Sequence, residues 1–113
     1  MTYEEMPCEK AFAALADPSR REVFKRLRAG PLPVVAIARG MPVSRPAVSQ
    51  HLKILKEAGL VTDHALGTHR IYAIDTQGLA ALRSWLDQFW DDVLMAFAAE
   101  VERKPKSKKG RSR

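Results

Sequence analysis

The chain has 113 residues, 46% apolar and 28% charged, which suits one small domain with a single hydrophobic core. No apolar stretch approaches the about 20 residues of a bilayer-spanning helix, and the acidic start MTYEEMPCEK is unlike a secretory signal, so we expect a cytoplasmic protein without membrane association. The single cysteine, Cys8, excludes an intramolecular disulfide and cannot alone supply a structural zinc site.

The net charge of +6 is unevenly distributed. Residues 103–113 hold seven of the nineteen basic residues and no acidic one, whereas the rest of the chain carries twelve basic and thirteen acidic groups. A basic tail is common among nucleic-acid-binding proteins, but a lysine-rich end is equally typical of a solvated terminus. The composition predicts a folded domain over residues 1–102 and a basic, disordered tail over residues 103–113, whose role stays open.

The first third of the chain predicts two helices. One face of the first helix comprises Cys8, Phe12, Leu15 and Ala16. Asp17-Pro18 starts the second, because Asp is a favoured N-cap and Pro is preorganised for the first helical position. This helix should run to about Arg28, before Ala29-Gly30-Pro31 ends it. Its inward residues are predicted to be Val23, Phe24 and Leu27.

A helix-turn-helix is predicted next. A short apolar helix from about Val34 to Arg39 is followed by the turn residues GMPV, and Ser44 then occupies an N-cap position with Pro46 in the first turn. Gly59 suits a left-handed stop at the end of this second helix. The face that should enter the core consists of Val48, Leu52 and Leu55.

After Leu60 the apolar pattern changes to short β-rich stretches. Residues 61–64 and 69–74 predict two strands of a hairpin around Ala65-Leu66-Gly67-Thr68, which is a wing behind the helix-turn-helix. From about residue 76 to 102 the pattern is again helical and contains no proline. Such a helix is roughly 35 Å long, too long for a small domain to cover. We therefore expect a mainly α fold with a small β-hairpin wing, dimerised through terminal helices.

The polar face of the second helix carries side chains that bind phosphates or base edges. Arg45 can contact a guanine bidentately and Gln50 an adenine, while Ser49 suits either bases or phosphate. Thr68, His69 and Arg70 should project near the wing tip toward the minor groove or its phosphates. The alternative is an ordinary solvated face and a connecting loop. The remaining predicted DNA-contacting residues are Ser44, His51, Lys53 and Lys56.

The apolar stripe of the last helix predicts contact with a second copy of the chain. Large apolar side chains left exposed along such a helix would form a larger patch than most monomers tolerate. The predicted dimer interface consists of Phe12, Leu82, Leu86, Phe89, Trp90, Val93 and Phe97. The alternative is a protein-interaction module, in which this stripe binds a different protein and the winged fold is only a scaffold.

Three phrases, DPSRREVFKRLRAG, SRPAVSQHLKILKEAGLV and GTHRIYAID, resemble the ArsR/SmtB family of bacterial winged helix-turn-helix repressors over about residues 11–75. The resemblance implies a homodimer joined through its terminal helices, binding to a double-stranded DNA operator and repression of transcription. It assigns the recognition-helix positions to residues 44–53 and a wing role to Arg70. The ending LRSWLDQFWDDVLMAFAAEVE is similar to a subgroup without recognised metal ligands.

Metal ligands of the resembled family are missing here. Its thiolate site needs cysteines where this chain has Val34, Val35 and Ala36, and its other site needs histidines on the last helix, whereas His51, His64 and His69 all precede residue 75. We therefore expect a metal-independent repressor without a cofactor. The alternative is a metal-responsive repressor, or a redox-responsive one in which Cys8 is the reactive thiol. No nucleophile and base converge and no glycine-rich phosphate loop is present, so we expect no enzyme.

Overall fold

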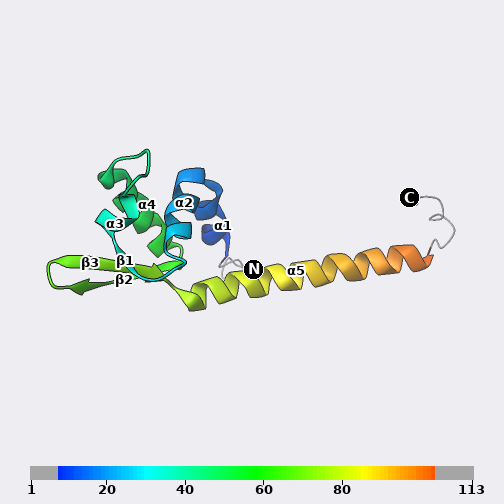
Figure 1. Ribbon diagram of the computed structural model, residues 1–113. Coiled ribbons are helices and arrows are strands. Elements are labelled where there is room, and N and C mark those ends of the chain that lie inside the picture. The colour runs from blue at the N-terminus through cyan, green and yellow to red at the C-terminus, as the bar shows by residue number, and fades with distance from the viewer. Residues whose placement is uncertain (1–7, 104–113) are drawn as a thin grey trace. The chain divides into compact units, whose positions relative to one another are not determined.

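The computed structural model describes residues 8–103, which form five helices and three strands (Figure 1). The elements in chain order are α1 (Glu9–Ala16), α2 (Pro18–Arg26), β1 (Leu32–Pro33), α3 (Val34–Ala38), α4 (Arg45–Glu57), β2 (Val61–Leu66), β3 (His69–Ile74) and α5 (Thr76–Arg103). The chain divides within α5, after Leu82, into two compact units. Arg103 is helical, and the rest of the predicted basic tail lies outside the described residues.

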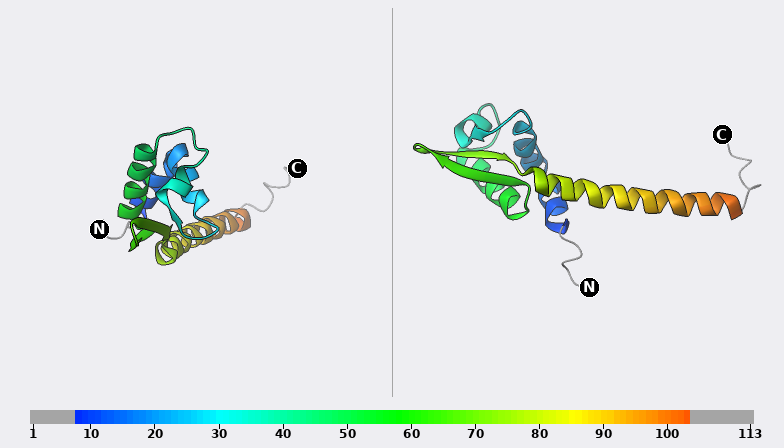
Figure 2. Two further views of the ribbon diagram at one scale, coloured as in Figure 1. Left: turned by 60° about the vertical axis from the view of Figure 1, so that its left-hand side comes forward. Right: turned by 90° about the horizontal axis from the view of Figure 1, so that it is seen from below.

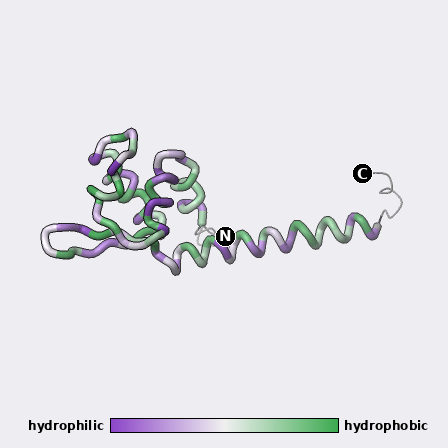
Figure 3. The backbone as a smooth tube through the Cα atoms, in the orientation of Figure 1, coloured by the Kyte–Doolittle hydropathy of each residue, from purple (hydrophilic) through white to green (hydrophobic). Residues whose placement is uncertain are grey.

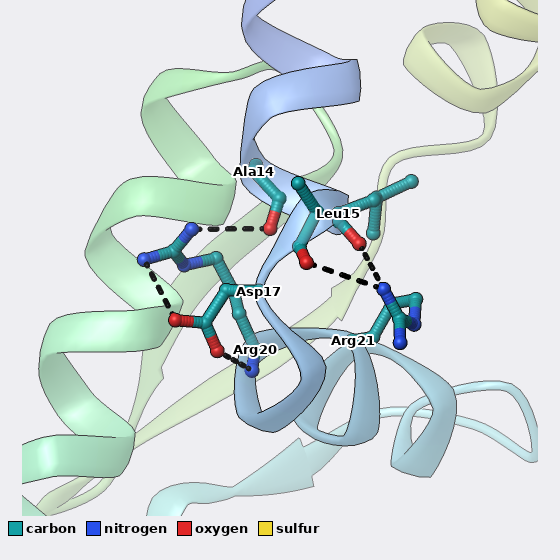
Figure 4. A network of polar contacts seen from close by, with 6 residues as sticks. Ala14, Leu15, Asp17, Arg20 and Arg21 are labelled. Atoms are coloured by element: carbon teal, nitrogen blue, oxygen red, sulfur yellow. Dashed lines mark hydrogen bonds and ion pairs between the residues drawn. The ribbon is translucent and has the colours of Figure 1, made fainter.

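The junction between α1 and α2 confirms the predicted N-cap at Asp17. The Asp17 carboxylate accepts a hydrogen bond from the backbone N–H of Arg20 at 3.0 Å, which lowers the pKa of this carboxyl (Figure 4). Arg20 in turn donates to the carbonyl of Ala14 at 3.1 Å, and Arg21 to that of Leu15 at 2.8 Å. These two cations satisfy carbonyls that the end of α1 leaves without helical partners, so they serve the fold rather than a ligand.

The core lies where α1, α2, α3 and α4 meet the sheet. Its buried residues are Ala11, Ala14, Val23, Leu27, Ile37, Val48, Leu52, Leu55, Leu60 and Val61. The predicted faces of α2 and α4 are confirmed, with Phe24 only partly buried. The predicted face of α1 was wrong at Phe12 and Ala16, which are exposed, and right at Cys8 and Leu15. Ala11 and Ala14 are buried in their place, whereas Phe12 is 39% exposed. Alanines let α1 approach α2 and α4 closely, and this close packing turns the large Phe12 ring outward.

The helix-turn-helix is built as the sequence predicts. The Ser44 hydroxyl accepts from the backbone N–H of Ala47 at 3.2 Å, and Gly59 at the end of α4 adopts a φ of +81°. Arg26 of α2 donates to the carbonyls of Ile37 at 3.2 Å and Arg39 at 2.6 Å, which ties the end of α3 to α2. α2 thus holds the end of α3 where the turn toward α4 begins.

The sheet contains one more strand than the two predicted. β2 and β3 pair antiparallel from Val61 opposite Ile74 to Leu66 opposite His69, and the hairpin extends beyond the helices of its unit (Figure 2). The turn is shorter than predicted, since Ala65 and Leu66 continue β2. The additional β1 pairs Leu32 with Tyr72. A two-residue edge strand containing proline carries no alternation in the sequence, which is why it was missed.

The start of α5 contacts the residues that end α4 through a hydrogen bond and close backbone packing. The Asp75 carboxylate accepts from the backbone N–H groups of Gln77 at 3.0 Å and Gly78 at 3.1 Å, while the Asp75 N–H donates to the carbonyl of Leu60 at 2.9 Å. Gly78 lies so close to Gly59 that a Cβ at position 78 would overlap the Gly59 carbonyl oxygen. Glycine at position 78 therefore permits a backbone contact that no other residue allows. None of the helices described is both long and apolar enough to cross a membrane.

Candidate nucleic-acid interface

α4 presents a polar face opposite its buried one. Val48, Leu52 and Leu55 are fully buried, and because successive residues turn by about 100°, Ser49, Gln50 and Lys53 between them point outward. The predicted DNA-contacting residues that are exposed at the start and on the outer side of α4 are Ser44, Arg45, Ser49, Gln50, Lys53 and Lys56. Six of the seven candidates on this helix thus reach solvent, with hydroxyl, amide, guanidinium and ammonium groups that can donate hydrogen bonds.

His51 differs from the other candidates on α4. Its side chain is half-buried, and its Nδ1 atom is buried with no hydrogen-bond partner among residues 8–103. The imidazole lies close enough to Asp17 to contribute to the lowered pKa of that carboxyl. A ligand outside the helix can therefore reach less of the His51 side chain than of the exposed Gln50 or Lys53 side chain.

The structure brings the beginning of α4 and the wing together. Arg45, Thr68, His69 and Arg70 line a hollow of about 300 Å³, together with residues 33–35 at the junction of β1 and α3. All three wing candidates are exposed. Arg45 and Arg70 each bring a guanidinium group to this hollow, and such a group can bind an anion such as a phosphate through paired hydrogen bonds.

Asp63 is the residue of this surface that sequence reasoning missed. Its carboxylate lies 2.8 Å from the Lys56 ammonium and 3.3 Å from Nε of Arg70, and its side chain is only 10% exposed. The hydrogen bond from Lys56 lowers the pKa of Asp63, so the carboxyl stays ionised at neutral pH. Strand alternation could have indicated it, because Asp63 shares a face of the hairpin with Ala65, the cross-strand neighbour of Arg70.

An apolar stripe runs along α5 beyond residue 82. Leu86, Phe89, Trp90, Val93 and Phe97 are each between 40% and 65% exposed. At about 100° per residue they fall within roughly a third of the helix circumference. Hydrophobic and hydrophilic residues alternate along this segment (Figure 3). Phe89 stacks on Trp85 with ring centroids 5.5 Å apart. Two further interface candidates belong to the first unit, where Phe12 is exposed and Leu82 packs partly against the core.

Metal-binding side chains do not gather in the part of the chain that is described. No group of three or more His, Cys, Asp or Glu residues within 8–103 lies close enough together to hold a metal ion. Cys8 is buried, and its thiol donates a weak hydrogen bond to the carbonyl of Ala81 with a separation of 3.8 Å. The thiol therefore packs as part of the fold, where burial limits its access to oxidants.

Known proteins share this combination of elements. Residues 15–64 match the model of a helix-turn-helix domain. The chain is 53% identical over 94 residues to the HTH-type transcriptional regulator Rv2034 of Mycobacterium tuberculosis, covering 83% of this chain and 88% of that protein. It is 35% identical over 78 residues to the transcriptional repressor SdpR of Bacillus subtilis, covering 69% of this chain and 87% of the repressor.

A solved structure shares the fold. The homodimeric winged helix-turn-helix DNA-binding domain Mb0332 of Mycobacterium bovis, described as a possible ArsR-family regulator, superposes with a TM-score of 0.62 at 28% identity and covers 78% of this chain and 82% of that one. The relatives are transcriptional regulators and not enzymes, in agreement with the sequence prediction. The chain belongs to the ArsR/SmtB family of winged helix-turn-helix transcriptional regulators.

Proposed function

We propose that the protein is a cytoplasmic, homodimeric repressor that binds an inverted-repeat operator in double-stranded DNA. The observation that carries this proposal is the exposed polar face of α4, which begins at Arg45 beside the wing residues Thr68, His69 and Arg70. A helix of about 13 residues with hydrogen-bond donors on its outer face fits the major groove, and a neighbouring hairpin reaches the flanking backbone. Membership of a family of transcriptional regulators supports this assignment.

Within this interface, the residues divide by chemistry into those that contact bases and those that contact phosphates. Recognition helices contact base edges with their N-terminal residues, so Arg45 is assigned to a guanine, Gln50 to an adenine and Ser49 to either base or phosphate. The wing residues Thr68, His69 and Arg70 approach the minor groove and its phosphates. The remaining residues, assigned to phosphates near the helix, are Ser44, His51, Lys53 and Lys56.

The dimer is proposed to form through the apolar stripe of α5. Uncovered side chains such as Leu86, Phe89 and Phe97 would expose more apolar surface than a monomer usually carries. The homodimeric state of the Mycobacterium bovis domain supports a homodimer here. A symmetric dimer presents two copies of α4, which is the reason for expecting an inverted repeat. The same stripe also fits a protein-interaction module, which would form a stable complex with another protein and bind no DNA.

Substitution of the two base-contacting residues tests the interface. Arg45→Ala or Gln50→Ala is expected to weaken operator binding by about 1–3 kcal/mol and to change binding to random DNA much less, because only the operator satisfies these base contacts. Fluorescence anisotropy with both duplexes measures the difference. Arg28→Ala is the matched control, since Arg28 is an exposed arginine outside the proposed interface. Equal losses on both duplexes would show that Arg45 and Gln50 contact only the DNA backbone.

Operator binding is proposed not to depend on a metal ion. Adding zinc, copper or arsenite in stoichiometric amounts, or a chelator, is expected to leave operator affinity unchanged, because the positions of the family's ligands carry Val34, Val35 and Ala36. Titrations with and without each metal measure this. A tenfold shift in affinity, about 1.4 kcal/mol, with one metal would reveal a metal site formed in the dimer.

A further inference from the structure

Two cations assigned to the DNA backbone are already paired within the protein. Lys56 ends the exposed face of α4 and Arg70 lies on β3, and both side chains are more than half exposed. Asp63 on β2 lies between them, with one carboxylate oxygen 2.8 Å from Lys56 and the other 3.3 Å from Arg70. One carboxylate therefore holds the last turn of the recognition helix and the wing together.

This arrangement differs from the ion pairs along the helices. Glu22 pairs with Lys25 and Arg26, which lie three and four residues further along α2, and its side chain is 45% exposed. Such exposed pairs contribute little, because water screens both charges. The Asp63 side chain is 10% exposed and its two partners come from different elements. Two short contacts to one shielded carboxylate give the cations a partner that competes with a DNA phosphate.

We propose that Asp63 is a positioning residue that lowers affinity for all DNA by withholding Lys56 and Arg70 from phosphates, and that raises the preference for the operator by fixing the wing against α4. The inference rests on the proposed function and revises it at Lys56 and Arg70, which pair with Asp63 instead of contacting phosphates. Phosphate contacts are sequence-independent, so each cation withheld lowers the affinity for operator and for random DNA alike and leaves their ratio to the base contacts and the wing. A wing that is already fixed loses less conformational entropy when it docks on the operator. Non-specific binding does not require an ordered wing, so it gains less from this effect.

Asp63→Asn tests this inference, because it removes the charge and preserves the size of the side chain. The slope of log K against log salt for random DNA is expected to steepen by about 1–2, since each released cation that reaches a phosphate adds about 0.9. Affinity for random DNA should rise about tenfold near 0.1 M salt, and the operator-to-random ratio should fall. Asp63→Glu retains the carboxylate and is expected to keep the wild-type slope.

Two matched variants separate this effect from net charge and from folding. Glu22→Gln causes the same change in charge and also releases two cations, but on α2, so its slope should equal that of the wild-type protein. Combining Asp63→Asn with Lys56→Gln and Arg70→Gln should return the slope to the wild-type value.

The outcomes distinguish this inference from the function on which it rests. An unchanged or shallower slope in Asp63→Asn, with the circular dichroism spectrum of the wild type, overturns the role of Asp63. If Asp63→Asn does not fold, the variant that combines it with Lys56→Gln and Arg70→Gln carries the test. A slope shallower than that of the wild type by about 2 then overturns the role of Asp63, because both cations must contact phosphates in the wild-type protein. A wild-type protein that prefers no DNA sequence refutes the proposed function itself.

Discussion

Replacing Phe89 and Val93 by glutamate is expected to make the protein monomeric and to weaken operator binding more than 100-fold, or about 3 kcal/mol. Both side chains belong to the apolar stripe of α5, where they are 49% and 40% exposed in the single chain. Two carboxylates placed on this stripe cannot be buried against a second copy without losing their hydration. A monomer carries one recognition helix and therefore contacts only half of an inverted repeat.

The control introduces the same charges on the opposite side of the helix. Ser84 and Gln88 are exposed and lie about 160° from the centre of the stripe, so Ser84→Glu with Gln88→Glu should remain dimeric. Sedimentation equilibrium at micromolar concentration gives the oligomeric state, and titration with operator DNA gives the affinity. A dimer that persists in the variant with Phe89→Glu and Val93→Glu would place the interface outside this stripe.

Gly78→Ala is expected to lower the free energy of unfolding by about 1–3 kcal/mol, although alanine is normally the better helix residue. In an exposed helix interior the same replacement usually gains about 1 kcal/mol. Here the new Cβ would overlap the carbonyl oxygen of Gly59, which belongs to the backbone and cannot rotate away. The steric cost therefore exceeds the gain in helix propensity, and the contact between the end of α4 and the start of α5 must open.

Urea unfolding followed by circular dichroism measures this effect. The neighbouring Gln77 is exposed, so Gln77→Ala should change stability by no more than about 0.5 kcal/mol. Stabilisation by Gly78→Ala would mean that α5 does not begin against Gly59 in solution.

Local signals in the sequence predicted most of the fold. Asp17-Pro18, Ser44 and Gly59 mark helix ends through hydrogen bonds and dihedral angles that depend on a few neighbouring residues, and the structure confirms each of them. The inward face of α4 was also predictable, because large apolar residues recur there at the helical period. In α1 the alanines leave the period ambiguous, and only packing against α2 and α4 selects Ala11 and Ala14 over Phe12.

The candidate site was predictable residue by residue but not as an arrangement. Exposure of Arg45, Ser49 and Gln50 follows from the helical period once the buried face is known. The pairing of Lys56 and Arg70 through Asp63 depends on how the hairpin packs against α4, which connects residues separated by a loop and a turn. For the same reason the sequence could not indicate that His51 turns one ring nitrogen into the protein.

Selection of bound duplexes from a random DNA pool tests the central claim most directly, since the pool contains every short operator sequence and favours none of them. A homodimer that inserts α4 into the major groove should enrich an inverted repeat whose half-sites are about one helical turn apart, roughly 10 base pairs, or a multiple of it. Arg45→Ala should relax the enriched sequence at one position in each half-site. Enrichment of no sequence, or of a single half-site without a symmetric partner, would contradict recognition by a dimer through α4.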